Sequence, residues 1–145
     1  MIGNEVIQSD FVTDLKAASA ITTLLASASE VRELQYQGAD FDYPALRVHI
    51  DENRPIVTRE QCDHANLMLT IRVFGEGGSS REVSSIATVV NNRYHRRNFH
   101  GTGWYTWLRT MMLPGPRRVS ENLWMSEVVL RGVIYPTSEF VTPTG

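Results

Sequence analysis

A glycine- and serine-rich segment at residues 75–80 has a composition that suits phosphate binding, because glycine-rich loops before a helix present backbone N–H groups to an anion. The segment matches Gly-x-Gly-x-x-Ser, an incomplete dinucleotide-binding pattern, and lacks the Gly-Lys-Ser/Thr of a P-loop. Ser79 and Glu82 also have the spacing of a capping box that opens a helix. We therefore favour a turn before a helix over a phosphate site.

Cys62 and His64 are two residues apart, so they share one face of a predicted strand, and His49 is a candidate to lie across the sheet from them. Three such groups can hold a metal ion, but no carboxylate or fourth ligand follows at a recognisable spacing. Cys62 is the single cysteine of the chain, which excludes an internal disulfide. We expect a surface histidine beside a buried thiol, with no metal and no cofactor.

Basic side chains precede an aromatic stretch in the second half of the chain: Arg93, His95, Arg96, Arg97 and His100 come before Trp104, Tyr105 and Trp107. Cations with aromatic rings can bind single-stranded nucleic acid by phosphate pairing and base stacking. The same cations suit the C-terminal end of a helix, and the rings suit a core or a protein interface. A small nucleic-acid-binding module therefore stays an alternative, with Arg117 and Arg118 as a weaker basic signal.

The sequence contains no Gly-x-Ser-x-Gly, His-Glu-x-x-His or Cys-x-x-Cys motif. Nothing singles out a nucleophile, so we expect no enzyme, and an unrecognised small enzyme is kept only as an alternative. The 145 residues carry a net charge of −2 with 42% hydrophobic residues, which is typical of one soluble globular domain and argues against a dedicated nucleic-acid binder. The chain has no apolar run of membrane-spanning length and begins without a signal-peptide pattern, so we expect cytoplasmic synthesis.

Apolar spacing predicts two main helices and several strands. Ser9 or Asp10 is the expected cap of the first helix, and residues 53–60 are expected to form a long connection because Pro55 cannot donate to a central ladder. The predicted helices cover about residues 10–25 and 80–94, and the predicted strands cover residues 31–36, 46–50, 67–74, 104–108 and 123–135.

This order predicts an α+β fold, a mostly antiparallel β-sheet with two main helices packed on one face. We expect a single domain over residues 1–135 and an extended C-terminal arm at residues 136–145. One helical layer covers one face of the sheet, but apolar side chains point to both faces. The surplus on the second face comprises Met68, Phe74, Met125, Val129, Val133 and Tyr135. Such a surplus indicates a protein interface, most simply self-association.

Five stretches of the chain resemble the phage tail terminator (tail completion) family, small proteins like the one that caps the lambda tail. Residues 14–25 look like the opening helix of the family, and residues 43–48 (Tyr-Pro-Ala-Leu-Arg-Val) are similar to a following strand. Residues 67–74 resemble the next strand, residues 80–94 the next helix, and residues 126–135 the closing strand. The likeness consists of element order and apolar periodicity, and the chain departs from it at residues 104–107 and 114–118.

The resemblance implies a structural virion protein. Members of the family form a six-membered ring at the head-proximal end of a phage tail, stop polymerisation of the tail tube, and dock to the head connector, while genomic double-stranded DNA passes through the lumen. For this chain the resemblance implies a hexameric homo-oligomer in the virion, with the tail tube protein and a head-closure protein as partners. A head-closure or adaptor ring of the phage neck stays an alternative.

Contacts between subunits or with the tube are expected at three variable segments and on the last strand. The residues assigned to these contacts are Arg54, Ile56, Val57, Arg59, Arg117, Arg118, Met125, Val129, Val133 and Phe140.

Overall fold

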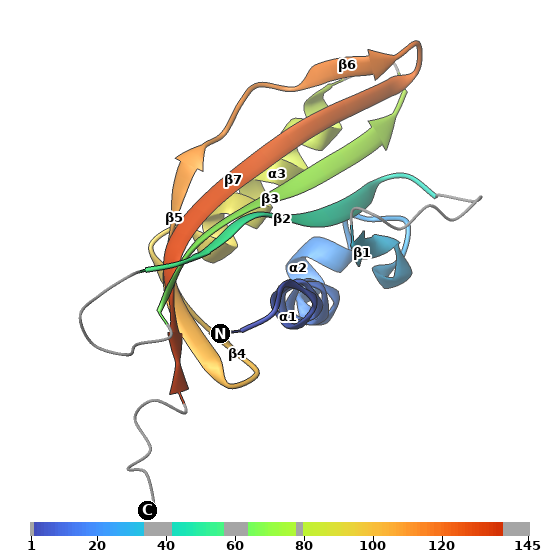
Figure 1. The fold of residues 1–145 in the computed structure, drawn as a ribbon. Coiled ribbons are helices and arrows are strands. Elements are labelled where there is room, and N and C mark those ends of the chain that lie inside the picture. The colour runs from blue at the N-terminus through green and yellow to red at the C-terminus, as the bar shows by residue number, and fades with distance from the viewer. Residues whose placement is uncertain (1, 34–41, 57–63, 78–79, 138–145) are drawn as a thin grey trace, which may run out of the picture.

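The protein is built on a seven-stranded sheet with two main helices, and the computed structural model describes residues 2–33, 42–56, 64–77 and 80–137 (Figure 1). The elements, in chain order, are α1 (Asn4–Ala17), α2 (Ser19–Thr22), η1 (Ala28–Glu30), β1 (Val31–Glu33), β2 (Ala45–Pro55), β3 (Ala65–Glu76), α3 (Arg81–Tyr94), β4 (Arg97–Gly101), β5 (Trp104–Met112), β6 (Arg117–Ser120) and β7 (Leu123–Pro136).

The long strand β7 organises the sheet, whose strand order is β1-β2-β3-β7-β5-β4. β3 pairs with one edge of β7 over residues 123–134. The other edge is shared, because β6 pairs with residues 123–125 and β5 with residues 129–136. Among the described strands β1 runs parallel to β2, and the remaining pairs are antiparallel. The predicted α+β fold with a mostly antiparallel sheet is confirmed.

Helix α3 follows the sequence prediction closely. Its buried side chains are the expected stripe, Val83, Ile86, Ala87, Val90 and Tyr94. They join one core cluster with the inward side chains of β3 and β7 and with those of α1, so both helices cover the same face of the sheet. None of the helices in the described residues is long and apolar enough to span a membrane.

The first helix begins earlier than predicted, and the expected cap at Ser9 or Asp10 is wrong. Helix α1 starts at Asn4 with Gly3 as its N-cap, and Ile7, Phe11 and Leu15 form its buried stripe. The helix then ends at Ala17, because Ala18 adopts an extended conformation before the short α2. Asp10 and Asp14 therefore lie within the helix, where they bind other elements.

Two strands were not predicted, and the ends of two others differ from the prediction; β5 continues to Met112 beyond the predicted end at residue 108. β2 continues through Arg54 and Pro55, which pair with Asn66 and Ala65, so the connection expected from residue 53 begins later. Pro55 is tolerated because, among the described residues, β1 pairs with residues 46–48 and no strand pairs with the outer edge of β2 at Pro55. β4 and β6 were not predicted, because β6 is exposed throughout and β4 has one buried side chain, Phe99.

The fold extends slightly beyond the predicted domain end. Pro136 closes β7, and the N–H of Thr137 donates to the carbonyl of Gly103 at 3.0 Å. The rest of the predicted C-terminal arm, residues 138–145, lies outside the described residues.

Candidate functional site

The described part of the glycine- and serine-rich segment, residues 75–77 and 80, forms a turn between β3 and α3. A Cβ atom on Gly75 would lie 2.7 Å from a methyl carbon of Val83, so glycine lets α3 pack close to β3. Gly77 has a positive φ of 118° and donates its N–H to the carbonyl of Asn122 at 3.0 Å. Ser80 is the N-cap of α3 without a side-chain capping bond, and Gly78 and Ser79 lie outside the described residues. These contacts support the turn favoured from the sequence.

The proposed metal ligands have other neighbours where they are described. His64 packs edge-on against the ring of Tyr135 at 4.7 Å, and Nε2 of His49 lies 3.7 Å from a carboxylate oxygen of Asp51. Cys62 lies outside the described residues. Within the described part of the chain no three histidine, cysteine or carboxylate side chains gather as metal ligands.

Two side chains of the basic and aromatic segment, Arg93 and Trp104, are held by contacts within the chain, and Asp10 of α1 holds the second. Its carboxylate accepts hydrogen bonds from the backbone N–H of Thr102 at 2.8 Å, from the hydroxyl of Thr102 at 2.7 Å and from Nε1 of Trp104 at 2.7 Å. Trp104 is fully buried. This indole is therefore part of the core and is not available to stack on a nucleic-acid base.

Asp14, one helical turn later, binds the end of α3. Arg93 donates two hydrogen bonds to its carboxylate, each 2.8 Å, and the hydroxyl of Tyr94 donates a third at 2.6 Å. Burial raises the pKa of Asp14, but the hydrogen bonds from Arg93 and Tyr94 outweigh it and hold the pKa below its usual value. Arg93 is thus bound within the chain, which weakens the nucleic-acid interpretation further.

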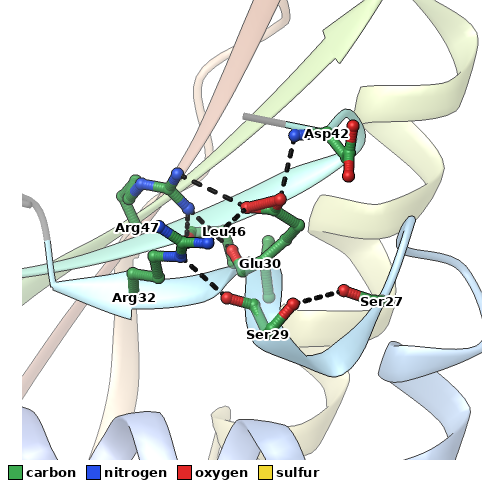
Figure 2. Close-up of polar contacts among 7 residues, drawn as sticks. All are labelled: Ser27, Ser29, Glu30, Arg32, Asp42, Leu46 and Arg47. Atoms are coloured by element: carbon green, nitrogen blue, oxygen red, sulfur yellow. Dashed lines mark hydrogen bonds and ion pairs between the residues drawn. The ribbon is translucent and has the colours of Figure 1, made fainter. Parts of the chain in front are cut away.

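A buried ion cluster joins η1 to β2 (Figure 2). Arg47, only 3% exposed, lies with its guanidinium 3.8 Å from the Glu30 carboxylate and donates to the carbonyls of Glu30 and Leu46 at 2.7 and 2.8 Å. Glu30 also accepts a hydrogen bond from the N–H of Asp42 at 2.9 Å and lies 3.6 Å from Arg32. The opposite charges offset one another, although Oε1 of Glu30 and Nη2 of Arg47 are buried without a hydrogen bond to a described residue, and the cluster connects the start of β1 to β2.

Exposed apolar side chains gather on β5, on β6 and in the loop between them. We call this set the β5–β6 strip; its members are Met111, Met112, Leu113 and Val119. Met112 is 57% exposed, and Trp107 nearby on β5 is 48% exposed. Among the described residues, Leu24 is the other large apolar side chain with comparable exposure. Exposed apolar side chains in this number are typical of a protein interface.

Two β-bulges explain why apolar side chains of the strip point outward. Thr110 pairs with Leu130 and Met112 with Val129, so Met111 is the extra residue of a bulge in β5. Val119 is the extra residue of a second bulge in β6, between Arg118 and Ser120. Bulges redirect side chains and are frequent beside functional sites.

Thr110 fixes the position of the first bulge. Its N–H donates to Nδ1 of His95 at 2.9 Å, and its hydroxyl donates to the side-chain oxygen of Asn91. Both partners belong to the end of α3 and the residue that follows it. The bulge is therefore held by the helix.

A basic hollow of about 290 Å³ lies beside the strip on the face of the sheet away from the helices. Arg109 and Arg131 stand directly opposite each other on β5 and β7, and neither forms an ion pair among the described residues. The other lining residues are Asn66, Trp107, Gly132, Val133 and Tyr135. A Cβ atom on Gly132 would lie 2.4 Å from the hydroxyl oxygen of Thr106, so glycine lets the two strands approach closely.

The structure places the interface residues expected from the sequence in several environments. Met125 and Val129 are on the face away from the helices but are only 5% and 8% exposed, while Val133 lines the basic hollow. Three arginines have partners within the chain: Arg54 pairs with Glu52, Arg117 with Glu127, and Arg118 with the carbonyl of Glu121. Ile56 is half-buried, and Val57, Arg59 and Phe140 lie outside the described residues. All ten remain predictions as interface residues.

Sequence reasoning missed the β5–β6 strip and the basic hollow. A usable signal was present at residues 111–113, Met-Met-Leu, because consecutive apolar residues in a strand cannot all point to one face. Arg109 and Arg131 carried no such signal, since their proximity depends on the register between β5 and β7.

Comparison with known proteins finds a similar fold in a solved structure and no matching family. No protein family matches the sequence, and no curated protein is similar to it in sequence. The fold is similar to that of a chain in a solved structure, the virion of a native gene transfer agent (GTA) particle, with a TM-score of 0.72 at 12% sequence identity. The likeness covers 90% of this chain and 95% of that chain, so the two folds agree over nearly their whole length.

Proposed function

We propose that this protein is a structural subunit of a phage-like virion, a tail terminator that forms a hexameric ring at the head-proximal end of the tail tube. The observation that carries the proposal is the fold likeness to a chain of a gene transfer agent virion over 90% of this chain. The resemblance of residues 14–25, 43–48, 67–74, 80–94 and 126–135 to the tail terminator family supports the narrower role.

The surface of the molecule supports a role in assembly. The β5–β6 strip exposes apolar side chains to solvent. Such exposure is typical of a subunit that binds a partner. By contrast, the charged clusters around Asp10, Asp14 and Glu30 are occupied by partners within the chain. Recognition through complementary protein surfaces therefore fits the described residues better than chemistry at a pocket.

Capping follows from a ring with two different faces. One face binds the last ring of the tail tube as a further tube ring would. The opposite face lacks the surface that a tube subunit needs, so growth stops there and a head-closure protein binds instead. DNA passes through the lumen without recognition of its sequence, and the near-neutral chain, with a net charge of −2, does not bind it tightly.

Native mass spectrometry with negative-stain imaging of the purified protein over a concentration series tests the ring. We expect a species of about 98 kDa, six chains of 16.4 kDa each, with a central hole. A tight dimer without a ring would contradict the proposal.

Gold-labelled antibody against this chain tests the position in the virion independently of assembly in solution. We expect label where the tail meets the head, and on the free upper end of tails that have not joined a head. Label on heads alone, with unjoined tails unlabelled, would replace the terminator by a head-closure or adaptor ring of the neck.

A further inference from the structure

Two arginines face each other across a strand pair without a counter-charge. Arg109 of β5 and Arg131 of β7 are register partners, and like charges directly opposite each other destabilise a sheet. Both are exposed and line the basic hollow, together with the half-exposed ring of Trp107. Among the described residues, neither arginine has an ion-pair partner. An anionic group from outside the chain would remove this repulsion.

The opposite end of β7 carries three carboxylates, alongside the arginines Arg81 and Arg118. Glu76 ends β3 beside Leu123, and Glu121 lies in the turn between β6 and β7, next to the residue that binds Gly77. Glu82 lies in the first turn of α3, which packs against the end of β3. The three carboxylates are exposed and have no ion-pair partner in the described part of the chain. We call these residues the acidic end.

The acidic end and the basic hollow are too far apart to meet within one chain. Eight residues of β7 separate Leu123 from Arg131, and a strand rises about 3.3 Å per residue, so the two sites are about 26 Å apart. Figure 1 shows the β6–β7 turn and the end of β3 at one end of the sheet, with β4 and the end of β7 at the other.

We propose that the basic hollow of one chain receives the acidic end of a second copy. Arg109 and Arg131 bind the carboxylates of Glu76, Glu82 and Glu121 of the neighbouring copy in a head-to-tail contact. Trp107 and Val133 line the hollow and add apolar area to it. A contact between two different surfaces of identical chains generates a ring when the rotation closes, so this inference rests on the proposed ring and names its subunit contact.

Charge reversal tests the contact because both sides belong to the same sequence. One variant carries Arg109→Glu and Arg131→Glu, and the other carries Glu76→Arg and Glu121→Arg. Sedimentation velocity over a concentration series should show each variant alone as a monomer, with the dissociation constant raised about 100-fold or more, since like charges at an interface repel. An equal mixture of the two variants should assemble again, with the two chains in equal amounts.

A matched control carries Lys16→Glu and Arg97→Glu, which change the net charge by the same amount at exposed positions outside the hollow. We expect it to assemble like the wild type. Thermal melting of every variant checks that the fold is kept, as expected for surface substitutions. Raising the salt concentration should weaken wild-type assembly, because exposed charges are screened.

Several outcomes would overturn the contact. If the variant with Arg109→Glu and Arg131→Glu assembles normally, the proposed contact is wrong and the proposed ring is unaffected. A mixture of the two variants that stays monomeric would also overturn the contact, and so would a wild type that is monomeric at every concentration. In these cases the antibody labelling of virions tests the proposed function separately. If the arginine variant assembles normally but no longer binds a short labelled DNA duplex that the wild type binds, the partner of the hollow is phosphate.

Discussion

The two faces of the sheet differ in how completely their side chains are satisfied. On the helix-covered face, Phe11 stacks on Phe99 at 4.3 Å, and Asp10 and Asp14 bind Trp104 and Arg93. On the face away from the helices, Arg109 and Arg131 oppose each other with no ion-pair partner among the described residues, and the β5–β6 strip elsewhere on the sheet is exposed. The first region holds the chain together, and the second region, the arginines and the strip, is the surface proposed above to contact a partner. Substitutions in the first should therefore change stability, and substitutions in the second should change assembly.

Phe11→Ala should give the largest loss of stability. Phe11 is fully buried and also contacts Tyr94 at 5.6 Å and Trp104 at 6.0 Å, so its removal leaves a cavity in the aromatic cluster. We expect the free energy of unfolding to fall by about 3–5 kcal/mol. Urea denaturation followed by tryptophan fluorescence measures this, and a loss below about 1 kcal/mol would mean that α1 is not docked as described.

Glu30→Ala should come next. Its removal leaves the buried guanidinium of Arg47 without its counter-charge, and we expect a loss of about 3 kcal/mol. Glu30→Gln should cost less, because an amide oxygen can still accept the N–H of Asp42. Equal losses for the two substitutions would show that the hydrogen bond from Asp42 contributes nothing and that the whole effect comes from the charge of Glu30. The same denaturation measurement compares them.

Asp14→Asn should cost about 1 kcal/mol at neutral pH, since Arg93 is partly exposed and water screens the pair. The effect should depend on pH. The pKa of Asp14 is lowered in the fold, so its stabilisation is complete above the usual aspartate pKa of about 3.9 and is lost as the pH falls through the lower folded value. Wild type and variant should converge in stability at acid pH, and a constant difference down to that range would refute the ion pair.

Substitutions in the β5–β6 strip should affect stability least. Met111→Ser, Met112→Ser and Leu113→Ser together replace exposed side chains, so we expect each to change stability by about 0.5 kcal/mol or less. Assembly should nevertheless be lost in native mass spectrometry. Leu24→Ser is the matched control, because Leu24 is exposed but lies on another part of the chain. Loss of assembly in that control would remove the distinction between the two regions.

Periodic patterns predicted the parts of the fold that pack against the helices. The stripe of α3 and the alternation of β3 were visible because each buried position recurs at the spacing of its element. The start of α1 was missed because Asp10 and Asp14 look like first-turn residues, and their actual partners lie about eighty to ninety positions away. The surface proposed for contact was missed because bulges and strand register decide where Met111, Val119 and Arg131 lie, and a single sequence does not encode these locally.

The hydrogen bonds of Asp10 have a consequence for the order in which the chain becomes a folded subunit. Asp10 is separated by 92 positions from Thr102 and by 94 from Trp104. Ribosomes add about 5–20 residues per second, so Thr102 and Trp104 are synthesised roughly 5–20 s after Asp10. The strand that completes its anchoring, β5, also carries Met111 and Met112 of the strip, and the other two members follow it in the chain. Chains that end before β5 therefore lack the surface that we propose for assembly, so they do not associate through it on the ribosome.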